Sequence, residues 1–531
     1  MLALRTTIAL AVALLAGAAT SGRAQSAAQW QSRQLEASRQ SELIMRDADK
    51  RKGLLAQYQA MRYAYVGNHD PAFRIIFGQY LSWYQTFVGD YPAAATSFSI
   101  RQPALPDDRP SPLGNPNFTA RPARDAIADL ASNYRAVFLN EAHNVPLTRT
   151  LTVQLLGKLR AEGYNYFAAE TLYQTDSALQ SRGYPIKGSG FYTEEPICAE
   201  MVRTALKLGF KVIAYEATTD ATGNAREAEQ ARNIYRQVFE HDPAARLVVD
   251  AGYAHIQESG VYLGGKSMAE HLHRLSGIDP LTVEQTMLYP RQSVSDDHPY
   301  YQPIMQRLRP TGPIVFVNKA GKPWSLREGY DVSVFFPPQH LQHDRPDWLG
   351  LGGERLPYAV SGEQCHRSYP CLVEARYAGE SADAVPADRL ALDPVPFNAV
   401  TSDRISNGLI EPVSVLYLRP GRYNLTFSDV NAHVLFQQEI AVTAKNPHAA
   451  NEAPPPAPAS SQRAAAQPSA TRCAPAGARQ GSLAGQAGAL PERSPSDSLP
   501  VSSAASALAP TQPRAAACMT TALRKALDTR V

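Results

Sequence analysis

Short apolar runs alternate with amphipathic, helix-like segments over residues 123–320, and this alternation restricts the fold more than any other feature of the chain. The apolar runs cover residues 136–139, 166–169, 210–215, 246–251, 281–288 and 314–317. The helix-like segments cover residues 123–133, 147–162, 196–208, 225–240 and 267–275. Strands that alternate with helices form parallel sheets with both faces covered, and continuously apolar strands fit such a sheet. We therefore predict an α/β fold whose mostly parallel sheet is flanked by helices, over residues 123–330.

The region before this domain, residues 25–122, has a different pattern. Residues 26–63 contain no proline and only Gly53 as an interruption, so they predict a helix with a ragged apolar stripe. More apolar and aromatic residues follow up to Phe87. Together they predict a helical N-terminal arm that packs on the main domain, and the proline-rich residues 103–122 predict an extended linker.

Beyond residue 330 the predicted strands become short and are divided by turns. They cover residues 332–336, 372–377, 413–418, 423–427 and 434–442. This spacing predicts a β-rich C-terminal module over residues 331–445, with a small β-sandwich-like unit at residues 370–445. Residues 446–531 are rich in Pro, Ala and Ser and nearly lack aromatic residues, which predicts a disordered tail.

Residues 1–24 have the pattern of a secretory signal peptide. Arg5 precedes an apolar run at residues 8–16, and Gly22 and Ala24 place small residues at the −3 and −1 positions of a cleavage site. The run is too short to span a membrane, and no later stretch is long and apolar enough to do so. We expect a periplasmic or secreted protein without a transmembrane segment.

The net charge and the positions of the cysteines limit the expected partners and disulfides. A net charge of +3 over 531 residues is small, which argues against nucleic acid as a partner. In an oxidising compartment, Cys365 and Cys371 could close a small loop as a disulfide. Cys198 falls in a predicted helix, where we expect a buried free thiol.

Ionisable residues follow four of the predicted strands at their carboxyl ends. These residues are Glu141 and His143, then Glu170, then Glu216, then His255. In a parallel sheet such strand ends lie along one edge, where ligands and catalytic groups collect. Because charged groups at a partly buried edge are costly unless they are paired or bound to a ligand, we expect these side chains to converge.

Three interpretations of this set remain open. All five residues could hold a divalent metal, since imidazole suits Zn or Fe and carboxylate suits Mg or Mn. They could instead form a metal-free site in which a Glu orients a His that deprotonates water. They could also be unrelated polar residues that happen to end four strands.

Three segments in this region carry a family resemblance: residues 139–146 (LNEAHNVP), 168–171 (AAET) and 251–256 (AGYAHI). They resemble motifs of the erythromycin-esterase/ChaN-like superfamily, which is also linked to the TIKI/TraB proteins. That family has an early G-E-x-H or G-E-x-x-H, a Glu that ends the second strand, and a later G-x-x-H. The matching residues here are Glu141 with His143, Glu170, and Gly252 with His255. The resemblance covers roughly residues 120–320.

The resemblance implies a different activity for each branch of the family. The erythromycin-esterase branch hydrolyses a lactone with His-activated water, the TIKI branch is a metal-dependent protease, and the ChaN branch binds haem. Arg149, in the next predicted helix, corresponds to the assisting Arg of some members. Asn140 departs from the pattern because it stands where the family usually has Gly. Asn accepts a left-handed backbone better than most residues, so the turn could survive, but the change could also mean an altered site.

We therefore expect a hydrolase of an ester, lactone or peptide bond that acts on a small-molecule or peptide substrate. His143 would act as general base or metal ligand, and Glu141 and Glu170 would orient or ligate. His255 would stabilise charge or complete a metal site, and Arg149 would assist.

Two alternatives belong to other functional classes. The first is a non-catalytic haem- or iron-binding protein of the ChaN-like type, in which Tyr253, His271 and His273 would permit haem contact. His271 and His273 are, however, expected at surface positions of one helix. The second is a degenerate scaffold that acts through the β-module and the N-terminal arm.

Overall fold

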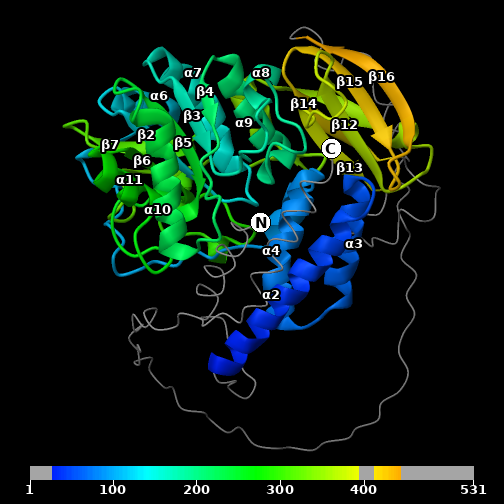
Figure 1. The fold of residues 1–531 in the computed structure, drawn as a ribbon, viewed down its shortest axis with the longest axis horizontal. Helices are drawn as coiled ribbons and strands as arrows, with labels where there is room; N and C mark the ends of the chain where they lie inside the picture. The colour runs from blue at the N-terminus through cyan, green and yellow to red at the C-terminus, as the bar shows by residue number, and fades with distance from the viewer. Residues whose placement is uncertain (1–26, 394–411, 444–531) are drawn as a thin grey trace, which may run out of the picture. The chain divides into compact units, whose positions relative to one another are not determined.

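A computed structural model of the chain describes residues 27–393 and 412–443 (Figure 1). These residues form a mixed α/β fold with a helical N-terminal region, a large sheet flanked by helices, and smaller antiparallel sheets toward the C-terminal end. The predicted fold class is confirmed. The predicted signal peptide and the predicted disordered tail lie outside the described residues.

The large sheet has the strand order β1-β7-β8-β6-β2-β5-β3-β4. Its strands are β1 (Phe118–Pro122), β2 (Ala136–Glu141), β3 (Tyr166–Ala169), β4 (Lys211–Ile213), β5 (Leu247–Gly252), β6 (Leu281–Leu288), β7 (Ile314–Asn318) and β8 (Val332–Phe335). The strands from β8 to β4 in this order are parallel, and β7 and β1 extend the sheet with antiparallel pairings. In the centre, β2 and β5 end together, because Glu141 is in register with Gly252.

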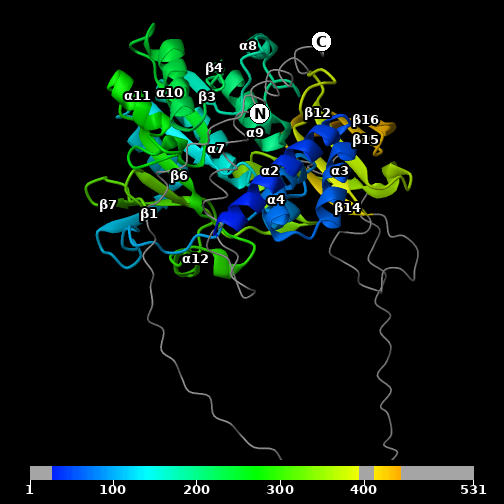
Figure 2. The same cartoon turned by 60° about the horizontal axis from the view of Figure 1, so that its bottom comes forward.

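Helices cover both faces of the sheet, as Figures 1 and 2 show. They are α6 (Ala123–Ala131), α7 (Leu147–Ala161), α8 (Leu179–Arg182), α9 (Pro196–Lys207), α10 (Gly223–Ile234), α11 (Met268–Ser276) and α12 (Tyr301–Leu308). Because side chains alternate along a strand, Val137 and Leu139 of β2 join the core under α6, α7 and α9, whereas Phe138 joins the core under α10 and α11. Residues that end β2 and β5 therefore face either the α7 side or the α10 side.

Two predicted boundaries of the α/β domain are wrong. We predicted residues 332–336 as part of the C-terminal module, but β8 pairs in parallel with β6 and all four of its residues are buried. An isolated apolar tetrapeptide does not reveal which sheet it joins. Residues 118–122, predicted as linker, form β1 at the edge of the sheet, where Pro122 is tolerated.

The described part of the N-terminal region contains four helices, where we predicted one helix over residues 26–63 followed by further apolar and aromatic residues. They are α2 (Ala27–Asp49), α3 (Leu54–Gly67), α4 (Pro71–Phe87) and α5 (Tyr91–Ser97). The break falls at Gly53, whose φ of +85° few other residues adopt, and Asp70 caps the start of α4. Trp83 of α4 packs edge-on against Phe191 and Tyr192 of the main domain. The expected packing of this arm on the main domain is confirmed.

The C-terminal module has two antiparallel sheets that share one hydrophobic core. One sheet pairs β11 (Leu356–Ser361) with β14 (Val413–Leu418); the other contains β12 (Cys371–Tyr377), β13 (Asp388–Leu392), β15 (Gly421–Ser428) and β16 (Val434–Val442). These two sheets start at Leu356, earlier than residue 370, where the β-sandwich-like unit was predicted to begin. A short hairpin, β9 (Leu341–Gln342) with β10 (Arg345–Pro346), precedes it.

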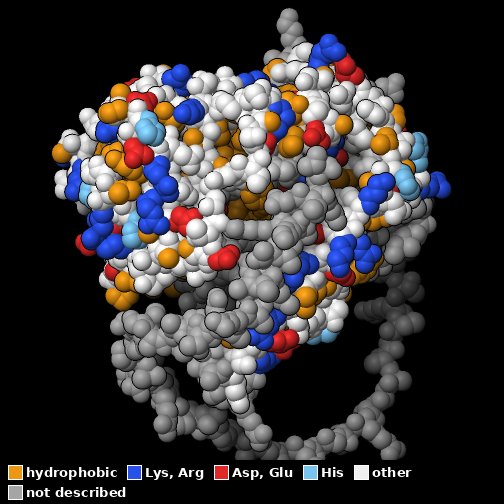
Figure 3. All heavy atoms as spheres, in the orientation of Figure 1, with side chains coloured by type: hydrophobic (Ala, Val, Ile, Leu, Met, Phe, Trp, Pro, Cys, Tyr) orange, Lys and Arg blue, Asp and Glu red, His pale blue; other side chains and the backbone are white. Residues whose placement is uncertain are grey.

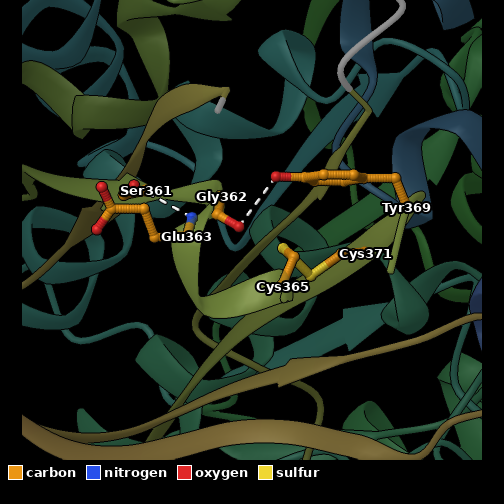
Figure 4. The surroundings of a disulfide bond; sticks show 6 residues. All are labelled: Ser361, Gly362, Glu363, Cys365, Tyr369 and Cys371. Atoms are coloured by element: carbon orange, nitrogen blue, oxygen red, sulfur yellow. Dashed lines mark hydrogen bonds between the residues drawn. A yellow bond between two sulfur atoms is a disulfide. The ribbon is translucent and has the colours of Figure 1, made fainter. Parts of the chain in front are cut away.

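Cys365 and Cys371 form a disulfide within this module, as predicted (Figure 4). Both cysteines are buried, and the nearby Tyr369 hydroxyl donates to the Gly362 carbonyl over 2.9 Å. Cys198 is a buried free thiol in α9, which also agrees with the prediction. None of the helices in the described part of the chain is long and apolar enough to cross a membrane. On the face drawn in Figure 3, positive and negative side chains are intermixed.

Candidate functional site

The carboxyl ends of β2, β3 and β5 bring five of the six predicted site residues together. Glu141 ends β2 and His143 follows it, while Glu170 follows β3. His255 lies in the short helix η4 (Tyr253–Ile256) directly after β5, and Arg149 lies in the first turns of α7. All five side chains belong to residues that are at most 5% exposed. Such deeply buried charges require partners, and each has one.

Glu141 and His143 form the first pair, on the α7 side of the sheet. Glu141 Oε1 lies 2.9 Å from His143 Nδ1, and Arg149 Nε forms an ion pair with the other carboxylate oxygen. Arg149 also donates from Nη2 to the His143 carbonyl over 3.3 Å. Burial alone would raise the pKa of Glu141, but Arg149 and His143 lower it below its usual value. Glu141 is therefore a carboxylate that holds the imidazole by Nδ1.

The His143 ring lies between aromatic side chains and a glycine. It stacks on Tyr192 with ring centroids 4.1 Å apart and an interplanar angle of 10°, and Tyr253 meets it edge-on at 5.2 Å. A Cβ atom at Gly252 would lie 2.6 Å from His143 Nε2 and 3.0 Å from Glu170 Oε2. Nε2 therefore lies directly over Gly252, next to the second carboxylate, and only a glycine leaves room for it.

Glu170 and His255 form the second pair, on the α10 side. Glu170 Oε1 lies 3.4 Å from His255 Nε2, and Glu170 Oε2 accepts from the Gly252 amide over 2.7 Å. Glu227 holds the other ring nitrogen, Nδ1, at 2.7 Å. Burial alone would lower the pKa of His255, but Glu227 and Glu170 raise it to about 10. His255 is therefore an imidazolium at neutral pH.

Arg226 of α10 completes this second cluster. Its Nη2 lies 3.0 Å from Glu170 Oε1, and it also forms an ion pair with Glu216. Burial alone would raise the pKa of Glu170, but His255 and Arg226 lower it well below its usual value. Glu216, the sixth predicted residue, contacts Arg226 and Gln230 but neither site histidine. It belongs to the outer side of the cluster.

The five residues predicted as metal ligands do not fit a metal centre. No group of three or more His, Cys, Asp and Glu residues within residues 27–393 and 412–443 has a metal-binding arrangement. The carboxylates that would ligate a cation are instead neutralised by the guanidinium groups of Arg149 and Arg226. Of the three predicted haem contacts, Tyr253 lies in the site against His143, whereas His271 and His273 lie on α11, where His271 contacts Asn224.

Asn140 has a different role from the one expected for it. It lies within β2 and does not adopt a positive φ; the left-handed residue of the site is Tyr253, with φ of 48°. Asn140 Nδ2 donates to the Tyr253 carbonyl over 2.8 Å, and its Oδ1 accepts from the Gln285 amide over 2.6 Å. Asn140 thus ties the strained Tyr253 peptide to β6.

Several residues of the site were not predicted from the sequence. Glu227 carried a signal, because it shares one face of α10 with the buried apolar residues Ala231 and Ile234, where a charge must find a buried partner. Arg226 is its neighbour in sequence. Tyr192 carried no such signal, and neither did Glu195, whose carboxylate lies 3.5 Å from Arg149 Nη1. Both lie between the second predicted strand and the predicted helix at residues 196–208.

A surface pocket opens beside the loop that follows His143. Asn144, Val145, Phe98, Tyr289, Arg291 and Trp348 are among the residues that line it. Asn144 is held in place by its Nδ2, which donates to the Phe98 carbonyl over 2.8 Å. The pocket therefore combines an apolar, aromatic wall with an arginine, next to the first Glu–His pair.

Comparisons with known proteins find no matching family model and no matching curated protein. Among solved structures, the type III effector HopBA1 is 13% identical, with a TM-score of 0.27, and the match covers 42% of this chain and 99% of that chain. RRSP, a MARTX toxin effector domain from Vibrio vulnificus CMCP6, is 15% identical, with a TM-score of 0.24, over 46% of this chain and 52% of that chain. The C-terminal region of Pasteurella multocida toxin is 11% identical, with a TM-score of 0.23, over 46% and 33%. Likenesses this weak carry no argument about function.

Proposed function

We propose that the protein is a secreted or periplasmic hydrolase of an ester, lactone or peptide bond, related to the erythromycin-esterase/ChaN-like superfamily. The observation that carries this proposal is the contact between Glu141 and His143 Nδ1, with Arg149 behind the carboxylate. A carboxylate that holds one imidazole nitrogen sets the tautomer so that the other nitrogen can act as a base. Here that other nitrogen is Nε2, over Gly252.

The two Glu–His pairs have complementary roles in this proposal. His143 Nε2 removes a proton from water, and the resulting hydroxide attacks the carbonyl carbon of the substrate. His255, which is positively charged at neutral pH, stabilises the negative charge that develops nearby. When the tetrahedral intermediate collapses, the leaving group takes the proton back from His143.

The arginines favour this metal-free route over a metal-dependent one. Arg149 and Arg226 already supply the positive charge that a divalent cation would bring to Glu141 and Glu170. The haem-binding alternative has less support, since both ring nitrogens of His255 contact carboxylates and the His143 ring is stacked on Tyr192. In this proposal the substrate enters by the pocket that Asn144, the residue after His143, helps to line.

Substitution of His143 tests the proposal. We expect the wild-type protein to hydrolyse at least one member of a panel of p-nitrophenyl esters, lactones and peptides. We expect His143→Ala to lower kcat by about 10²–10⁴-fold without unfolding the chain, because it removes the general base. His241→Ala is a matched control, since the His241 side chain is 79% exposed. No turnover by the wild type, or unchanged turnover by His143→Ala, would contradict the proposal.

A further inference from the structure

We infer that Tyr192 is a further catalytic residue, whose hydroxyl donates a hydrogen bond to the substrate carbonyl oxygen as that oxygen becomes negatively charged. This inference rests on the proposed hydrolytic function. It adds to the site a hydrogen-bond donor that lies outside the three sequence motifs. It starts from the stacking of the Tyr192 ring on His143, which places the phenol beside the proposed base.

The Tyr192 hydroxyl is buried without a hydrogen-bond partner among the described residues. Tyr192 is only 3% exposed, and buried tyrosine hydroxyls normally find a partner within the protein. Leaving such a group unpaired destabilises the folded protein, because the hydroxyl has lost its hydrogen bonds to water. A donor that is unpaired at the centre of a cluster of charged groups is a donor kept for a bound molecule.

The surrounding chain holds Tyr192 firmly in this position. The Tyr192 amide donates to Thr171 Oγ1 over 2.8 Å, and Thr171 directly follows Glu170 of the second pair. Trp83 packs edge-on against the ring at 5.8 Å, and Phe191 does so at 5.3 Å. Because its backbone and its ring are both fixed, the hydroxyl needs no rearrangement when charge develops, which is the condition for effective electrostatic stabilisation.

Electrostatics keep this hydroxyl protonated. Burial, followed by the negative charges of Glu170 and Glu141, raises the pKa of Tyr192 well above its usual value. A phenol that stays protonated at neutral pH can donate a hydrogen bond to an oxyanion but cannot act as the base. This separates its role from that of His143.

The reaction step then has a defined place for every proton and electron pair. The water oxygen forms a bond to the carbonyl carbon while His143 Nε2 takes one water proton. The carbonyl π pair moves onto the carbonyl oxygen, which accepts the hydrogen bond from Tyr192. The pair returns as the bond to the leaving group breaks, and the leaving group takes the proton from the His143 imidazolium. Tyr192 keeps its own proton throughout.

Tyr192→Phe tests the inference, because it removes only the hydroxyl. With the best substrate of the panel above, we expect kcat to fall by about 10²–10³-fold while KM stays within about threefold. We expect the melting temperature to be unchanged or raised, because the hydroxyl has no partner to lose. Tyr358→Phe is the matched control: its hydroxyl is also buried without a partner among the described residues, but it lies in the core of the C-terminal module.

The outcomes separate this inference from the proposed function. Unchanged kcat in Tyr192→Phe overturns the inference and leaves the proposed function standing. A clearly lowered melting temperature in Tyr192→Phe but not in Tyr358→Phe also overturns it, because the hydroxyl would then have a structural partner. A wild-type protein that hydrolyses no panel member overturns the proposed function and this inference together.

Discussion

At the scale of single residues, the site depends on a glycine and on the strained residue that follows it. Gly252 ends β5 and leaves room for the His143 ring, and its amide binds Glu170. Tyr253, with φ of 48°, then turns the chain so that its ring meets His143 edge-on. Strained backbone of this kind persists only where surrounding contacts hold it, and it is concentrated at functional sites.

Gly252→Ala should disturb the site only by steric overlap with His143, without straining the backbone. The φ of Gly252 is −69°, which alanine adopts readily, but the new Cβ would lie 2.4 Å from His143 Cε1. We expect a loss of about 1–3 kcal/mol of stability from overpacking, and a loss of about 100-fold in kcat from the displaced imidazole. Gly157→Ala in α7 is the control, since nothing lies within 4 Å of its added Cβ. Wild-type kinetics in Gly252→Ala would refute the arrangement of His143 over Gly252.

His255 should make stability depend on pH in a defined direction. Because Glu227 and Glu170, against the opposing effect of burial, raise its pKa from 6.5 to about 10, its contribution is complete below about pH 6.5 and is lost as pH rises toward 10. We expect the difference in unfolding free energy between wild type and His255→Gln to shrink over this interval in urea denaturation. His241→Gln, at an exposed position, is the control. A difference that grows with pH would show that His255 is not held as an imidazolium.

At the scale of elements, one buried asparagine joins two strands and the strained turn. Asn140 links β2 to β6 through Gln285, whose amide and side chain both bond to it, and links β2 to the Tyr253 carbonyl. The motif that this segment resembles usually has Gly at this position, but the strand geometry here needs no left-handed residue at Asn140. The substitution therefore changes what supports the site, without removing the turn.

Replacement of Asn140 by glycine tests this support. Asn140→Gly removes the side-chain hydrogen bonds to Tyr253, Glu284 and Gln285 and places a flexible residue within a strand, so we expect a loss of about 2–4 kcal/mol. We also expect kcat to fall, because the Tyr253 peptide is no longer held. Asn133→Gly, at an exposed position just before β2, serves as the control in chemical denaturation and kinetic assays. Equal stability of the two variants would mean that the Asn140 side chain contributes nothing.

At the scale of the whole molecule, the N-terminal helices and the C-terminal module both contact the segment around Tyr192 and α9. Trp83 of α4 packs on Tyr192, whereas the module forms ion pairs with α9 through Arg203 and Glu380 at 2.7 Å and Arg419 and Glu200 at 2.5 Å. The N-terminal helices and the C-terminal module, which carry no site motif, therefore pack against the segments that hold the site. Their removal would expose α9.

The disulfide should stabilise the C-terminal module without affecting chemistry. Cys365 and Cys371 are six positions apart, and closing so short a loop contributes about 2 kcal/mol. We expect the double variant Cys365→Ser with Cys371→Ser to lose about this much stability under oxidising conditions and to keep wild-type kcat. Under reducing conditions the wild type should lose the same stability. If the double variant were inactive but folded, the module would take part in the reaction.

Much of the α/β domain and of the site's location could be predicted from local patterns. The carboxyl ends of parallel strands necessarily share one edge of the sheet, so Glu141, Glu170 and His255 could be grouped from their positions in the sequence. The strand at residues 332–335 could not be placed, because an apolar tetrapeptide fits an α/β sheet and a β-module equally well. The metal interpretation was not supported, because arginines pair with the carboxylates that would bind the cation. The motifs alone could not reveal these pairs, since they do not show which arginines lie nearby in the fold.

By itself, the sequence determined the periodicity of strands and helices, the ionisable residues at the strand ends and the spacing of the two disulfide cysteines, since all of these are local. Only the tertiary structure decided that Arg149 and Arg226 neutralise the carboxylates, that Gly252 makes room for His143, and that Tyr192 lies on its ring. The physical reason is that burial and charge pairing act between residues far apart in the chain. Their partners are selected by packing, which no local pattern records.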